Sequence, residues 1–123
     1  MEQTGDPNDE VWGVIFEIDA SEKQALDQAE GLGSGYDEQS VIPITPDGVQ
    51  FPHPTVAYVA TRKNANLQPY YWYKAFVLAG AEDHQLPAAY VADNIRAVAA
   101  QQDLDLTRRT NNESLLPPHR RLP

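Results

Sequence analysis

The first stretch of the chain with a clear hydrophobic pattern is residues 11–18, which read VWGVIFEI. This run is rich in β-branched and aromatic side chains and has almost no polar positions. Such a pattern is typical of a strand that is covered on both faces. We therefore predict a strand at the centre of a sheet. Residues 1–10 offer nothing that could pack beside it, and we interpret them as a flexible lead-in.

A helix is predicted directly after this strand. Asp19 or Ser21 can serve as its N-cap, and Gly31 supplies a stop signal. Between them the apolar positions form one helical stripe, made by Ala25, Leu26 and Ala29. This interpretation puts Glu30 at the end of the helix.

The next segment carries the signals of a β-hairpin. Residues 41–44 read as a strand that Pro43 confines to a sheet edge or a bulge. Residues 46–48 read PDG, in which proline presets φ and glycine accepts a positive φ. Residues 55–61, again dominated by β-branched and aromatic side chains, predict the returning strand.

Helical periodicity returns in the second half of the chain. A helix is predicted at about residues 70–82, and residues 85–87 separate it from a third helix that has Pro87 in its first turn. The apolar positions of the third helix recur at helical spacing and are Tyr90, Val91, Ile95 and Val98. From Leu104 onward no period is visible, so we expect residues 104–123 to be a mostly disordered tail.

Composition excludes several classes of protein. With 123 residues the chain has room for one domain. It has no cysteine, which rules out disulfides and thiol chemistry and is consistent with a cytoplasmic location. A net charge of −9 argues against nucleic acid as a partner. The sequence contains no run of about 18 apolar residues, so we expect no membrane-spanning helix. The three histidines are scattered along the chain, so we expect no metal site.

Four blocks of sequence, taken together, resemble the γ-glutamylcyclotransferases. The blocks are VWGVIFEI at residues 11–18, LDQAEG at 26–31, YK at 73–74 followed by AGA at 79–81, and LPAAY at 86–90. They occur in one colinear order over residues 11 to 95. The resemblance implies a mixed α/β (α+β) domain at residues 11–103, built around a small, partly open β-barrel with packed helices and without its N-terminal strands.

The resemblance also implies a reaction. The family, of lyase or acyltransferase type, cleaves γ-glutamyl amines or peptides to 5-oxoproline and a free amine, and uses no cofactor. The glutamate of its LDxxEG block is the catalytic acid/base and matches Glu30. Such a carboxyl should be partly desolvated, so we expect Glu30 to be half-buried. The alternative interpretation is that Glu30 is a solvated acid at the end of a helix, since glutamate is rarely buried.

Three tyrosines are candidates for substrate binding. Tyr58 and Tyr73 fall where the family has tyrosines in its cavity, and Tyr36 follows the glycine-rich turn. Each of them can equally be a packing residue, because tyrosine on strands and helices usually packs first. Asp27 lies one helical turn before Glu30, so the two carboxylates can share a face, where two nearby acids would raise the pKa of one of them. Asp27 is, however, more often a surface acid.

Two other hypotheses remain open. The family begins with a Tyr-Gly-Ser-Asn-type segment that binds anions, and this sequence contains no such segment. The chain is therefore either an enzyme, an inactive small-ligand or protein-binding domain of the same fold, or a fragment that needs another chain. In the last case an open sheet edge favours a homo-oligomer.

Overall fold

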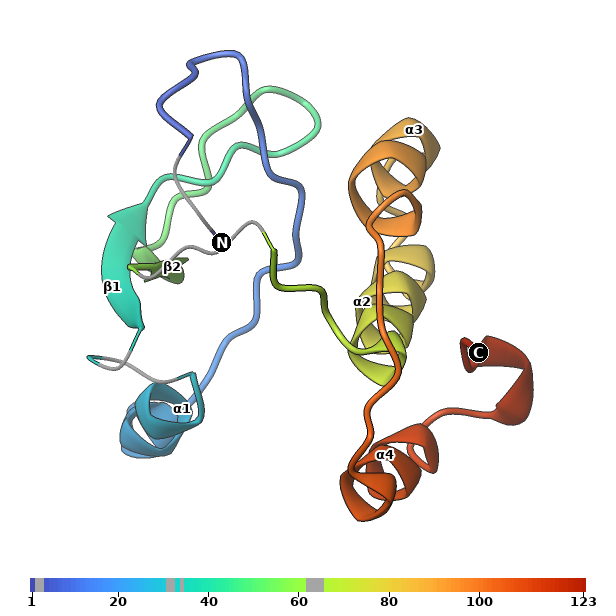
Figure 1. The fold of residues 1–123 in the computed structure, drawn as a ribbon. Helices are drawn as coiled ribbons and strands as arrows, with labels where there is room; N and C mark the ends of the chain where they lie inside the picture. Colours follow the sequence, from blue (N-terminus) through green and yellow to red (C-terminus); the bar gives the residue numbers. More distant parts are fainter. Residues whose placement is uncertain (2–3, 31–32, 34, 62–65) are drawn as a thin grey trace. The chain divides into compact units, whose positions relative to one another are not determined.

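The computed structural model describes residues 1, 4–30, 33, 35–61 and 66–123, and shows an α+β protein (Figure 1). The chain divides into two compact units. The N-terminal unit comprises Met1–Glu10 and Ile15–Asn64, and the C-terminal unit comprises Val11–Val14 and Ala65–Pro123. Each unit has its own candidate residues and is described by itself.

The N-terminal unit contains the predicted first helix. A 3₁₀ turn, η1 (Ala20–Glu22), leads into α1 (Lys23–Ala29), and Glu30 follows as the C-cap. Asp19 precedes the turn in an extended conformation, and its backbone carbonyl, rather than its side chain, accepts a hydrogen bond from the Glu22 amide at 2.9 Å. The predicted helix is therefore confirmed, while the predicted stop at Gly31 lies outside the described residues.

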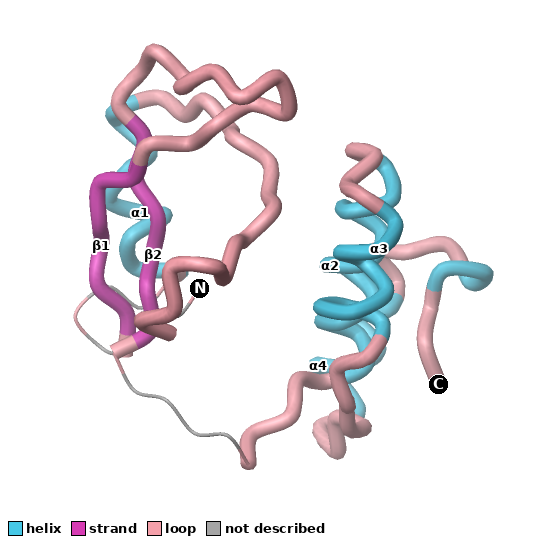
Figure 2. The backbone as a smooth tube through the Cα atoms, turned by 90° about the horizontal axis from the view of Figure 1, so that it is seen from above, coloured by secondary structure: helices cyan, strands magenta, loops and turns pink. Residues whose placement is uncertain are grey.

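Two antiparallel strands, β1 (Tyr36–Val41) and β2 (Thr55–Ala60), form the sheet of this unit (Figure 2). β2 is where the sequence predicted it. The partner strand lies earlier than predicted, because Pro43 has no amide hydrogen to donate and interrupts the ladder. Beyond it, an isolated bridge joins Ile44 to Gln50 around the predicted turn, and Gly48 takes φ +81° there.

The prediction of a central strand at residues 11–18 is wrong. All eight residues are described, and none of them belongs to a strand. Most are exposed, Phe16 to 73%. A strand that is apolar on both faces needs neighbours along its edges and layers above and below, and in the described part of the chain the sheet has only β1 and β2. The sheet is not closed, so the β-barrel remains a prediction.

Helices make up the C-terminal unit. α2 (Tyr71–Asp83) and α3 (Ala88–Val91) correspond to the two predicted helices, and α3 continues into a π-helical turn, η2 (Ala92–Arg96). The predicted break between them is confirmed, with Gln85 at φ +55°. The buried core packs α2 against α3 and η2, with Leu86 at its margin, and consists of Leu78, Ala81, Val91 and Ile95.

The segment that we expected to be a mostly disordered tail contains a further helix, α4 (Leu106–Glu113), and a short turn, η3 (Pro118–Arg120). The expectation rested on the absence of an apolar period. α4 is polar, and it is stabilised instead by its N-cap, because the Asp105 side chain accepts a hydrogen bond from the Arg108 amide at 3.0 Å. Polar capping therefore substitutes for an apolar stripe here.

Candidate functional site

Glu30 occupies the C-cap of α1, where its amide donates a hydrogen bond to the Leu26 carbonyl at 2.9 Å. Its side chain is exposed rather than half-buried. Asp27 precedes it by three positions, which makes the two carboxylates neighbours on the helix surface.

Two of the three candidate tyrosines lie on one face of the β1–β2 sheet. Tyr58 is directly opposite Glu38 in the register, and Tyr36 is opposite Ala60. Opposed residues share a face, as do residues two apart along a strand, so Tyr36, Glu38 and Tyr58 all belong to the same face. Tyr36 is exposed and Tyr58 is half-buried.

A cluster of four polar side chains joins this face to α1. The Lys23 ammonium donates to Asp27 and, at 2.7 Å, to Glu38. The Tyr58 hydroxyl also donates to Asp27, and the Lys23 ammonium lies 5.5 Å from the centre of the Tyr58 ring. We call these residues, Lys23, Asp27, Glu38 and Tyr58, the α1–sheet cluster. It fixes the helix that ends in Glu30 against the face that carries Tyr36 and Tyr58.

The cluster changes the electrostatics expected for Asp27. The Lys23 ammonium, and after it the Tyr58 hydroxyl, lower the pKa of Asp27, because both donate hydrogen bonds to its charged form. The same bond to Asp27 raises the pKa of Tyr58. Asp27 is therefore not an acid whose pKa is raised by its neighbour Glu30.

Tyr73 lies on α2, in the C-terminal unit, and is 54% exposed. Its ring meets the edge of Trp72 at 6.1 Å between centroids. The structure thus brings Tyr36, Tyr58 and the end of α1 together in one unit, and holds Tyr73 in the other.

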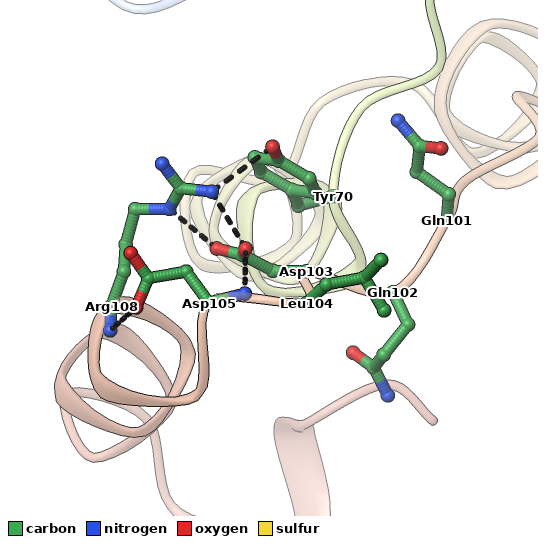
Figure 3. A pocket seen from close by; sticks show the side chains of 7 residues that line it. All are labelled: Tyr70, Gln101, Gln102, Asp103, Leu104, Asp105 and Arg108. Atoms are coloured by element: carbon green, nitrogen blue, oxygen red, sulfur yellow. Dashed lines mark hydrogen bonds and ion pairs between the residues drawn. The ribbon is translucent and has the colours of Figure 1, made fainter.

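A pocket of about 180 Å³ lies in the C-terminal unit, between the residue before α2 and the segment that leads into α4 (Figure 3). Its polar groups mostly bind one another. The Arg108 guanidinium donates two hydrogen bonds of 2.6 Å to the buried Asp103 carboxylate and one of 3.0 Å to the Tyr70 hydroxyl. The Arg108 guanidinium holds the pKa of Asp103 well below its usual range. Asp103, Tyr70 and Arg108 are therefore occupied by one another, while the Gln102 Oε1 atom, which also lines the pocket, is buried without a hydrogen-bond partner.

Sequence reasoning missed four of these residues. Lys23 could have been found, because it lies four positions before Asp27 on a helix, a spacing at which opposite charges meet. Glu38 depends on the strand register, and Asp103 and Arg108, five positions apart on one segment, reach Tyr70 only through tertiary structure. Among the described residues no three histidine, aspartate or glutamate side chains gather into a metal site. No helix in the same part of the chain is long and apolar enough to cross a membrane.

Comparison with known proteins adds the family. Residues 10–93 match the AIG2-like family. The chain belongs to that family. It is also 32% identical over 85 residues to a γ-glutamylcyclotransferase of Bos taurus and 33% identical over 85 residues to one of Homo sapiens. No solved structure matches the chain.

The extent of these matches matters for the site. Each covers 68% of this chain but 44% of the relative, so the chain spans less than half the length of the curated relatives it matches. The family match includes Glu30 and the three candidate tyrosines, whereas Asp103 and Arg108 lie beyond its end. The resemblance seen in the four sequence blocks is thereby confirmed, and the roles of individual residues remain predictions.

Proposed function

We propose that the chain carries γ-glutamylcyclotransferase-type chemistry: it cleaves a γ-glutamyl amine or peptide to 5-oxoproline and a free amine. The observation that carries this proposal is the match of residues 10–93 to the AIG2-like family, together with the two relatives named γ-glutamylcyclotransferase. The match contains the LDQAEG block and therefore Glu30.

The reaction needs one group that moves a proton between two nitrogens. The α-amino nitrogen of the substrate attacks its own γ-carbonyl carbon, which forms the ring C–N bond and breaks the bond to the leaving amine. A carboxylate that accepts the proton of the attacking nitrogen can then donate it to the leaving nitrogen. We assign this role to Glu30, and we assign Tyr36, Tyr58 and Tyr73 to substrate binding.

The α1–sheet cluster supports the choice of Glu30 over its neighbour Asp27. Asp27 accepts hydrogen bonds from Lys23 and Tyr58, and its pKa is lowered by both. A carboxylate that is held ionised in this way is a weak base and a poor proton carrier. Among the ion pairs of the described residues none involves Glu30, and its side chain is exposed to an incoming substrate.

Glu30→Gln tests the assignment, because the amide keeps the shape of the side chain and cannot carry the proton. We expect release of 5-oxoproline from γ-glutamyl dipeptides to fall by roughly 10²–10⁴-fold. Glu22→Gln is the matched control, since Glu22 is an exposed glutamate at the other end of α1. Circular dichroism checks that both variants fold. Equal activity in the two variants would remove Glu30 from the mechanism.

A second candidate function is a catalytically inactive domain that binds a small ligand or a protein, or a fragment that needs another chain. The exposed side chain of Glu30 favours the inactive domain, because a catalytic carboxyl is expected to be partly desolvated. Calorimetry with a γ-glutamyl dipeptide separates the two: binding without 5-oxoproline release identifies the inactive domain. We also propose that the chain forms a homo-oligomer, and sedimentation of the same sample tests this.

A further inference from the structure

The segment that enters α4 is tied by its backbone to the residues before α2. We call residues 101–108 the C-terminal arm. The Gln101 amide donates to the Pro69 carbonyl and the Tyr71 amide donates to the Gln101 carbonyl, each at 2.9 Å. Together these bonds make a parallel bridge between Tyr70 and Gln101. The arm therefore lies along the start of α2.

Asp103 is the centre of this attachment. It is 2% exposed, the one buried polar or charged residue of the described chain. Its carboxylate accepts hydrogen bonds from the Trp72 indole at 2.9 Å, from the Arg108 guanidinium and from the Asp105 amide at 3.0 Å. A buried carboxylate with this many donors is compensated and geometrically fixed. The bond to Asp103 uses the indole N–H of Trp72, which is the only polar group of that side chain.

The ring of Trp72, held in place by Asp103, contacts the aromatic rings around the start of α2. It stacks on Tyr70 at 5.9 Å and meets Tyr73 and Phe76 edge-on at 6.1 and 5.7 Å. Arg108 covers the Tyr70 ring at 4.9 Å (Figure 3). The aromatic rings at the start of α2 thus pack against the ring of Trp72, and Tyr73 is one of them.

We propose that Asp103 is a positioning residue: through Trp72 it fixes the first turn of α2 and the ring of Tyr73 in the orientation that binds substrate. This inference rests on the proposed function, because Tyr73 is assigned there to the substrate. It makes Asp103, which lies beyond the family match, a residue that acts on substrate binding.

Asp103→Asn is the main test. The amide removes the charge that holds Arg108 and leaves one oxygen to accept, so Trp72 and Tyr73 lose their fixed orientation. We expect KM for a γ-glutamyl dipeptide to rise by roughly tenfold while kcat changes little, because binding and not the proton transfer is affected. The indole N–H signal of Trp72, assigned with Trp12→Phe, should shift in the nuclear magnetic resonance spectrum.

Asp105→Asn is the matched control, since asparagine caps a helix as well as aspartate does and the side chain does not touch Trp72. If Asp103→Asn fails to fold, Arg108→Gln gives a milder version of the same change at a side chain that is 46% exposed. A purely structural role is separated by repeating the measurement in Tyr73→Ala: the effect of Asp103→Asn on KM should then vanish.

The outcomes are distinct for the two proposals. An unaltered chain that neither binds nor cleaves γ-glutamyl dipeptides overturns the proposed function and this inference with it. An active chain in which Asp103→Asn leaves KM unchanged, or raises it equally with and without Tyr73, overturns the inference alone. An active chain with a raised KM that depends on Tyr73 establishes it.

Discussion

Leu78→Ala measures how far the small core of the C-terminal unit holds α2 in place. Leu78 is 9% exposed and packs with Ala81, Val91 and Ile95. Leucine-to-alanine changes in cores cost about 2–5 kcal/mol, and the cost falls where the site can relax. This cluster is small and has solvent close by, so we expect the low end, about 2–3 kcal/mol.

The expected loss is large enough to see in a melting curve. For a unit of this size each kcal/mol shifts Tm by about 4–8 °C, so Leu78→Ala should melt roughly 8–24 °C below the unaltered chain. Val77→Ala is the control, because Val77 is the adjacent residue of α2 and is 40% exposed. Its cost should stay within about 0.5 kcal/mol. Thermal and urea unfolding followed by circular dichroism give both values, and similar losses in the two variants would refute the assigned core.

Two further measurements test local features. Gly48→Ala should destabilise the protein by about 1–2 kcal/mol, because Gly48 has φ +81°. Gly80→Ala should stabilise it by about 0.5–1 kcal/mol, because Gly80 lies inside α2 with open space at its Cβ position; urea unfolding that gives both changes the same sign would contradict this contrast. The pKa of Asp27 is lowered by Lys23, so its contribution is complete above the unfolded value of about 3.9 and is lost as the pH falls through the folded value. Tm should therefore drop below about pH 4, and drop less steeply in Asp27→Asn; parallel curves for the two proteins would show that the α1–sheet cluster does not stabilise the fold.

Local signals predicted the elements whose cause is local. Gly48 marked the turn between the strands, and Pro87 marked the start of α3. The apolar run at residues 11–18 failed as a predictor, because a strand exists only with partners that a single segment cannot reveal. α4 was missed for the opposite reason, since its cap at Asp105 was readable but its helix has no apolar stripe.

In the candidate site, too, local features were predictable from the sequence and contacts between distant residues were not. The position of Glu30 at a helix end followed from the sequence pattern and is confirmed. The contact between Tyr58 and Asp27 spans 31 positions and depends on the register of β1 and β2, so no spacing rule could have found it. Asp103 was unremarked because burial gives an acidic residue its importance, and burial is a property of the folded chain.

The bridge between Tyr70 and Gln101, with the bond from Trp72 to Asp103, closes a loop that contains α2, α3 and η2. The ends of a closed loop cannot fray one at a time, since opening either end gives up the contacts of both. The helices inside it should therefore open as one cooperative unit. The exchange of amide hydrogens in the first turn of α2 then reports on a carboxylate 31 residues further along the chain.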